Sequence, residues 1–522
     1  PTVSGPRQPP VGQATIAAAV TLAALAVGPG IGARSDVELL VFEVTGALAA
    51  QERSSTDTLP PVGRERVDAL EIDLLDFDPP RVEERTIAGG IPVLFLEDRA
   101  LPLIDFMVRF EGGYAHFDRE WYAVATAMPT LLRTGGTRSL LPDSVDLLLE
   151  HYALQTTFGS GGGSASGAVN TLTGNAEEAV TLWAEMMRSP RFDSSQIEIW
   201  RGRTLESVRR RNDNPGSMAF SRFNQLMFGD HPTGWEMTEA DVAPELLTPE
   251  RFEWLHDRIF CRQNMALGVS GAISWERAEA LLEEALAGWP DCPTALPDED
   301  TSPPRDSAGV FLIPRESLTQ SIVVMAEPGG VTREDREAYP AATIANSILG
   351  GSGFNSRLMS RIRTDEGLAY SVSSLWTTPT NGEGIVGAVA QTRADATNRT
   401  VRLILEEMRR MIQEDPTRDE VQLAIDQIVN GFVFNFQSAA QIVARQLLYR
   451  ARDLPGDWLE QYVDAIQRVG PGDVHRVVDE NLDPENMTIL IVGDTTRFDP
   501  SPEALGLSPG AVDAVQILDL GR

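Results

Sequence analysis

The sequence is poor in the residues that form metal sites at short spacing. Its 522 residues include two cysteines, Cys261 and Cys292, and five histidines. No two histidines lie three to five residues apart, and no Cys-x-x-Cys occurs. A zinc site built from neighbouring residues is therefore excluded, because such sites depend on these spacings. The two cysteines are compatible either with one disulfide in an oxidising compartment or with two free buried thiols.

Basic residues are also scarce. The chain has 44 Lys and Arg against 76 Asp and Glu, which gives a formal net charge of −32. A field of that sign repels nucleic acid and anionic lipid, so we expect no nucleic-acid partner. It favours solubility without indicating a substrate. The apolar fraction of 42% is typical of globular proteins.

Long apolar runs are absent beyond residue 60, so the sequence predicts no integral membrane span in the mature chain. Residues 14–28 and 37–50 are apolar but short. The second run ends in small residues followed by a polar stretch, a pattern typical of a secretory signal and its cleavage site. We therefore expect residues 1–50 to be a leader and the protein to be periplasmic or otherwise exported.

An internal repeat divides the rest of the chain. The motif Asp118–Thr126 (DREWYAVAT) recurs 217 residues later as Asp335–Thr343 (DREAYPAAT). In the same order, Asn264–Gly271 recurs 222 residues later as Asn486–Gly493. Two ordered recurrences at similar offsets predict two homologous halves. The expected boundaries are an irregular lead-in at 51–80, a first half at 81–290, a Pro/Asp-rich linker at 291–307, a second half at 308–499 and a tail at 500–522.

Each half shows the same order of patterns, namely a strand pair, a Gly-Gly turn, an Ala- and Leu-rich helix, further strands and long amphipathic helices. This order predicts an α+β fold in which each half is a mainly antiparallel sheet covered by helices. The expected strands are 91–96, 104–110 and 164–172 in the first half and 310–313, 321–326 and 384–391 in the second, with amphipathic helices at 177–188 and 397–413.

Three segments carry a resemblance to a known family. Residues 350–372 (GGSGFNSRLMSRIRTDEGLAYSV) are similar to the segment that holds the Arg/Tyr pair of pitrilysin/insulinase-type zinc peptidases, with Arg363 and Tyr370 at the family's spacing. Residues 122–137 resemble the helix that carries the family's inverted zinc motif H-x-x-E-H, and residues 189–215 resemble the helix with its third ligand. The resemblance covers roughly residues 80–500 and implies two halves that close like a clam shell.

The zinc motif itself is degenerate. On this chain the resemblance places Thr126 and Thr130 at the two histidine positions, Pro129 at the general base and Glu206 at the third ligand. Threonine does not replace imidazole as a zinc ligand, and proline neither binds zinc nor accepts a proton. We therefore expect no metal and no other cofactor in this chain, no activity in the chain alone, and a Glu206 that is an ordinary residue of the helix surface.

The Arg/Tyr pair is retained. In the family resemblance, Arg363 and Tyr370 donate hydrogen bonds to the substrate carbonyl and to the oxyanion that develops when water attacks. The residues alone leave another interpretation open, in which Arg363 forms a structural ion pair with Asp365 or Glu366 and Tyr370 is part of the core.

The retained pair implies a role in catalysis by a complex. We expect a non-catalytic subunit of a heterodimeric zinc metallopeptidase, whose homologous partner carries zinc and H-x-x-E-H and degrades unfolded peptides. Gly351, Gly353 and Phe354 would contact the peptide, which adds a strand to an exposed sheet edge. The segment Val108–Tyr114 matches the family's edge strand. The alternative is a structural or scaffold subunit of a larger complex without a role in proteolysis.

Overall fold

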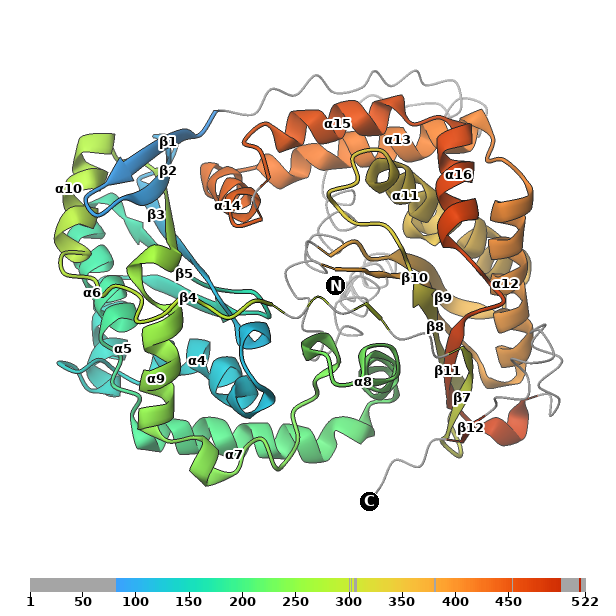
Figure 1. Cartoon of the computed structure of the whole chain (residues 1–522), viewed down its shortest axis with the longest axis horizontal. Helices are drawn as coiled ribbons and strands as arrows, with labels where there is room; N and C mark the ends of the chain where they lie inside the picture. Colours follow the sequence, from blue (N-terminus) through green and yellow to red (C-terminus); the bar gives the residue numbers. More distant parts are fainter. Residues whose placement is uncertain are drawn as a thin grey trace, which may run out of the picture.

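The computed structural model describes residues 81–299, 301, 303–304, 308–379, 382–452 and 454–498, together with a short strand at 516–517. The predicted leader and lead-in lie outside these residues, as does the predicted tail apart from that strand. Within the described ranges, no helix is both long and apolar enough to cross a membrane. Figure 1 shows two α+β halves side by side, each with one sheet.

The first half contains a six-stranded sheet in the order β1-β2-β6-β3-β5-β4. Strands β2 and β6 run parallel, and the other neighbours are antiparallel. The strands are β1 (Glu83–Ile87), β2 (Ile91–Glu97), β3 (Leu103–Glu111), β4 (Gln155–Ser160), β5 (Ser164–Leu172) and β6 (Met265–Gly271). In β5 buried and partly exposed residues alternate, as expected for a strand whose two faces lie in different surroundings.

The second sheet has the order β12-β7-β11-β8-β10-β9. Its arrangement repeats the first, because β11 lies between β7 and β8 as β6 lies between β2 and β3. The strands are β7 (Gly309–Pro314), β8 (Gln320–Pro328), β9 (Ala369–Trp376), β10 (Ile385–Arg393), β11 (Thr488–Gly493) and β12 (Gln516–Ile517). The predicted α+β class with two mainly antiparallel sheets is confirmed.

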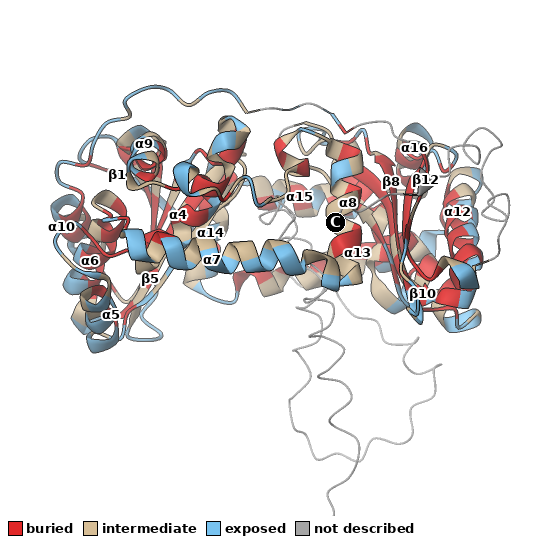
Figure 2. Cartoon of the chain, turned by 90° about the horizontal axis from the view of Figure 1, so that it is seen from below, coloured by how far each residue is buried: buried red, intermediate tan, exposed pale blue. Residues whose placement is uncertain are grey.

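Helices cover both sheets, and Figure 2 shows the buried residues concentrated between helices and strands. The first half contains α4 (Tyr122–Thr134), α5 (Pro142–His151), α6 (Ala176–Arg188), α7 (Ser194–Arg210), α8 (Pro215–Phe228), α9 (Pro249–Ile259) and α10 (Trp275–Ala285). The second contains α11 (Ala338–Asn346), α12 (Thr397–Gln413), α13 (Arg418–Phe432), α14 (Ala439–Arg450), α15 (Trp458–Arg468) and α16 (Pro471–Asn481). Side-chain caps define several starts, including Asp193 before α7 and Asn214 before α8.

Each half contributes one helix to the other half. Helix α8 leaves the end of the long helix α7 and packs on the second sheet, against β8 and β11, while α14 packs on the first sheet, against β2 and β6 (Figure 1). The α8 contact is a closed core of Met218, Ala219, Phe223 and Met227 with the facing side chains of the second sheet, including Val324 and Leu490. The α14 contact joins Val443 and Leu447 to Leu94 and Met107. The two halves are therefore interlocked rather than merely connected.

A disulfide fixes the beginning of the linker. Cys261, which is buried just after α9, is bonded to Cys292, and their Cα atoms are 4.9 Å apart. Residues next to the two cysteines also hold these segments together. The Trp289 indole N–H donates to the Phe260 carbonyl at 2.8 Å, and Arg262 is paired with Asp291. Of the two alternatives left open by the sequence, the structure contains the bonded one.

Replacing Cys292 by serine is expected to lower the free energy of unfolding by about 2–4 kcal/mol, because the bond closes a loop across a sequence separation of 31 residues. Urea unfolding of the full chain measures this change. Reductant should bring the wild-type midpoint down to that of the variant and leave the variant unchanged. Equal midpoints for the oxidised wild type and the variant would show that the bond contributes nothing to stability.

Candidate functional site

The degenerate zinc positions lie on α4. Thr126 and Thr130 are exposed, and Pro129 is half-buried inside the helix. The Thr126 hydroxyl donates to the Tyr122 carbonyl at 2.7 Å, so its polar group is engaged by its own helix. Pro129 has no N–H and leaves the helix without the hydrogen bond that this residue would otherwise donate. None of these side chains fits a zinc ligand or a general base.

Glu206, at the third-ligand position, lies exposed on α7, which packs beside α4. Its carboxylate is paired with Arg210 one helical turn away, at 2.6 Å. Such exposed pairs on a helix are ordinary surface features and contribute little to stability. Among the described residues, no three His, Cys, Asp or Glu side chains converge as a metal site. The residues present at the family's zinc position therefore do not fit a zinc ion.

The Arg/Tyr pair is arranged differently. Arg363 lies near the end of the π-helical segment Met359–Asp365, and Tyr370 is the second residue of β9. The guanidinium carbon of Arg363 lies 4.8 Å from the ring centre of Phe354 and 5.8 Å from that of Tyr370. Phe354 is 67% exposed and Tyr370 is 51% exposed. Arg363 itself is half-buried, and the three residues form one cluster at the surface, which we call the Arg363 cluster.

The alternative interpretation of this pair does not match the arrangement. Glu366, one proposed partner of Arg363, is instead paired with Arg361 and Arg399. For Asp365, the other proposed partner, no ion pair with Arg363 is found among the described residues. Tyr370 is half-exposed rather than part of the core. The Arg363 guanidinium instead lies over two aromatic rings, where the negative faces of the rings attract its positive charge.

Glycines bring the loop before the cluster close to β9. A Cβ at Gly350 would clash with the Ser374 amide nitrogen, and the Ser374 hydroxyl in turn donates to Asn346. Gly351 lies against Asn346, where a Cβ would come within 3.0 Å of the side-chain nitrogen. Gly353 adopts a left-handed φ of +66°, which favours glycine. Gly351 and Gly353 therefore shape the loop, and Phe354 is the side chain that the loop exposes.

An ion pair that sequence reasoning missed holds this loop to α13. The Arg357 guanidinium binds Glu420 through two hydrogen bonds of 2.7 and 3.0 Å, and the side chains are 13% and 31% exposed. Glu420 also accepts from the Thr417 amide at 2.8 Å in the capping box that begins α13. Burial alone would raise the pKa of Glu420, but the hydrogen bonds from Arg357 and Thr417 outweigh it and lower the pKa to about 2.

This pair predicts acid sensitivity of the loop. Because the pKa of Glu420 is lowered from 4.5 to about 2 on folding, its stabilisation is complete above pH 4.5 and is lost as the pH falls toward 2. We expect Glu420→Gln to cost roughly 1–2 kcal/mol at pH 7 and much less near pH 2, with partial exposure limiting the size. The free energy of unfolding of the wild type and of Glu420→Gln, measured across this pH range, gives the comparison. The exposed Glu406→Gln on α12 is the control, and an equal pH profile for both variants would contradict the assignment.

The prediction that Val108–Tyr114 forms an edge strand is wrong. Val108–Tyr114 begins inside β3, and β3 is paired on both sides, with β5 and with β6. The sheet edge on that side is β4, which lies beside α4. The central position of β3 follows from β6, which returns late in the chain and lies between β2 and β3.

Comparisons with known proteins agree with the two-sheet fold and with the loss of the zinc residues. Residues 247–428 match the family model described as the peptidase M16 inactive domain. A crystal structure of a peptidase M16 inactive domain from Pseudomonas fluorescens has a TM-score of 0.70 and 25% identity, covering 80% of this chain and 98% of that one. A Helicobacter pylori protein named non-peptidase homolog YmxG is 19% identical over 78% of this chain and 93% of its own length.

Proteins named as zinc proteases are also similar to this chain. One from Streptomyces coelicolor is 24% identical over 51% of this chain, and one from Mycobacterium leprae is 27% identical over 39% of it. The aligned segments span 58% and 46% of those relatives. Taken with the duplicated fold and the degenerate zinc positions, these findings show that the chain has the fold of M16 peptidase-like proteins and matches the family's inactive domain over residues 247–428.

Proposed function

We propose that this chain is the non-catalytic subunit of a two-chain zinc peptidase and contributes the Arg363 cluster in trans to a partner that carries zinc and H-x-x-E-H. The observation that carries the proposal is the Arg363 guanidinium, held over the rings of the exposed Phe354 and Tyr370. A structural arginine would be expected to pair with a carboxylate. A half-buried guanidinium beside an exposed phenol is suited to donate to a substrate oxygen.

The chemistry would be divided between the two chains. Zinc and the general base of the partner would activate water for attack on a peptide carbonyl. Arg363 and Tyr370 would donate hydrogen bonds to the carbonyl oxygen as negative charge develops on it. Phe354, at the tip of the loop shaped by Gly351 and Gly353, would contact the side chains of the peptide.

A peptide substrate would bind by extending a sheet. Strands β4 and β9 end their sheets on corresponding sides, and β9 carries Tyr370. A peptide paired with such an edge is held by its backbone, so that many sequences are accepted. This mode suits unfolded peptides better than folded proteins. The Cys261–Cys292 bond supports an exported location, since disulfides persist in oxidising compartments.

The scaffold alternative has one observation in its favour, namely the similarity to a relative named a non-peptidase homolog over most of both chains. In that case the chain would bind its partner or a larger complex without taking part in cleavage. The Arg363 cluster would then have no effect on any hydrolysis by the complex.

Peptide hydrolysis by this chain, by the zinc-bearing partner and by their mixture separates the alternatives. We expect no activity from this chain alone and chelator-sensitive activity from the mixture. Activity of the lone, metal-free chain would overturn the proposed division of labour. Partner activity that is unchanged when this chain is added would favour the scaffold alternative.

A further inference from the structure

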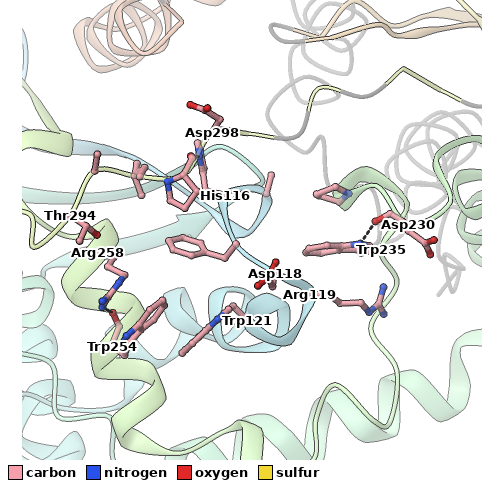
Figure 3. A pocket seen from close by; sticks show the side chains of 16 residues that line it. His116, Asp118, Arg119, Trp121, Asp230, Trp235, Trp254, Arg258, Thr294 and Asp298 are labelled. Atoms are coloured by element: carbon pink, nitrogen blue, oxygen red, sulfur yellow. Dashed lines mark hydrogen bonds between the residues drawn. The ribbon is translucent and has the colours of Figure 1, made fainter.

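The cavity of about 610 Å³ in the first half has an aromatic lining that other residues of the chain already cover. Trp121 and Trp254 stack on each other with ring centres 4.0 Å apart. Arg251 lies 3.9 Å over Trp121, and Arg258 lies 3.5 Å over Trp254. Figure 3 shows Trp121, Trp254 and Arg258 together on one side of the cavity. These two tryptophans therefore present no open ring face to a ligand.

A different kind of surface lies in the second half, at the outer side of β7, which we call the β7 edge. The Gly309 and Arg315 amides donate to carbonyls at the two ends of β11, at 3.1 and 2.8 Å. With the unbroken parallel register between β7 and β11, these contacts place every odd-numbered residue of β7 in hydrogen bonds with β11. The backbone groups of Val310 and Leu312 therefore point the other way, toward the β7 edge.

Both faces of β7 are covered, so a further strand can approach it only from the edge. Phe311 and Ile313 belong to the core that the second sheet forms with α8. Val310 belongs to the core on the opposite face, and Leu312 packs against that core. Pro314, the last residue of β7, has no N–H and lies at a position that faces the β7 edge, where proline is tolerated. The part of the β7 edge that can pair with a strand is therefore the stretch before Pro314.

The first sheet has a strand in the corresponding place. The two sheets have matching strand orders, in which β1 lies outside β2 as β12 lies outside β7. Strand β1 precedes β2 and pairs with it in the antiparallel direction over its whole length. Strand β12 comes after every other described strand and pairs with β7 in parallel, with Gln516 opposite Phe311 and Ile517 opposite Leu312 (Figure 1). The same place is thus filled from opposite ends of the chain in the two halves.

We propose that the β7 edge is a strand-binding site and that its occupant is the segment of this chain around Gln516 and Ile517. Residues 512–520 (VDAVQILDL) include three β-branched residues, which favour strands. Residues 494–515 connect this segment to β11, and they are enough for the crossover that a parallel strand requires. Because the segment is tethered, it competes well with free strands for the edge. Its binding closes the β7 edge against pairing with a second copy or with an unfolded peptide.

The closed edge bears on the proposed function without depending on it. Strands β7 and β9 lie toward opposite ends of the second sheet, and β9 carries Tyr370. With the β7 edge filled by the chain itself, a peptide can extend this sheet only at β9. The strand-binding property of β7 uses none of the residues of the Arg363 cluster.

The first test measures hydrogen exchange of backbone amides in the full chain. In the register of β12 with β7, the Leu312 amide faces the added strand and the Gln516 amide faces β7. Gln516→Pro removes an amide that the pairing needs, so we expect the Leu312 amide to exchange roughly tenfold faster or more. The Phe311 amide, which faces β11, should keep its rate. Ala504→Pro, in the segment that connects β11 to β12, is the matched control, and an equal rate for Leu312 in both variants would overturn the proposal.

The second test supplies the strand as a separate labelled peptide of residues 510–522, with binding followed by fluorescence anisotropy. We expect it to bind the full-length Gln516→Pro variant at least about tenfold more tightly than the wild type, whose own segment competes from its tether. A peptide N-methylated at Gln516 should lose binding. One N-methylated at Ile517 should retain it, because the Ile517 amide faces away from β7.

Three outcomes of the peptide experiment would each contradict the assignment. These are no binding of the unmodified peptide to the variant, equal binding to variant and wild type, and equal binding of the two N-methylated peptides. Neither test involves hydrolysis or a partner chain. Failure of the proposed peptidase role would therefore leave these results unchanged, and the reverse also holds.

Discussion

Replacing Arg363 by alanine is expected to lower turnover by the proposed two-chain peptidase by about 100- to 1000-fold, while leaving association of the chains intact. The magnitude is that of removing one donor to a developing oxyanion. Because the interaction strengthens as the oxyanion forms, the loss should fall on kcat more than on KM. Peptide hydrolysis at saturating partner measures it, with sedimentation or titration to confirm association.

Conservative variants separate the donor role from stacking. Arg363→Lys keeps the charge but loses the planar fork, and should retain only a small part of the activity. Tyr370→Phe keeps the ring beside Arg363 and removes the hydroxyl, so the stability of the chain should not change while turnover falls. Arg99→Ala, an exposed arginine of the first half, is the matched control. Turnover of Arg363→Ala equal to that of the control would favour the scaffold role.

Truncation of Phe223 to alanine is expected to destabilise the whole chain by about 3–5 kcal/mol, although the residue belongs to a helix of the first half. Phe223 is fully buried in the core that α8 forms with the second sheet. Its loss leaves a cavity between the halves rather than within one of them. Unfolding followed separately by probes in each half should therefore show both transitions shifted together.

The control is Phe354→Ala, which removes the same atoms from a position that is 67% exposed. It should change the free energy of unfolding by less than about 0.5 kcal/mol. A shift of the second-half transition alone in Phe223→Ala would show that the interlocked helices do not couple the halves. A destabilisation near that of the control would show that α8 is not tightly packed on the second sheet.

Local patterns in the sequence predicted individual elements well. Ser164–Leu172 alternates with a period of two and is β5, and Thr397–Gln413 has apolar residues at helical spacing and is α12. These signals are local because one face of each element packs on one core. The duplicated order of elements was readable for the same reason, since each half repeats the same local patterns.

Long-range features were not readable in the same way. Which sheet α8 and α14 would cover depends on contacts with the other half, and neither helix differs in pattern from its neighbours. The edge prediction for Val108–Tyr114 failed because β6 pairs with β3 from far along the chain. The consecutive apolar residues Phe106–Val108, all buried in the structure, are typical of a central strand and were a usable signal.

The candidate site shows the same division. The spacing of Arg363 and Tyr370 and the loss of the zinc residues were visible in short segments. The contact of Arg363 with Phe354 and the pair between Arg357 and Glu420 depend on how the loop folds back, which spacing does not reveal. The Glu420 carboxylate closes the capping box with Thr417 and also binds Arg357.

The exchange of α8 and α14 also sets an order of events on the ribosome. The first sheet has all its strands once β6 is made, but the face with Leu94 and Met107 stays uncovered until α14 has emerged, some 180 residues later. At translation rates of about 5–20 residues per second, this interval lasts roughly 9–36 seconds. During that time the nascent chain presents an apolar sheet face to the cell, which makes it a natural client of chaperones. Final folding must then await nearly the whole polypeptide.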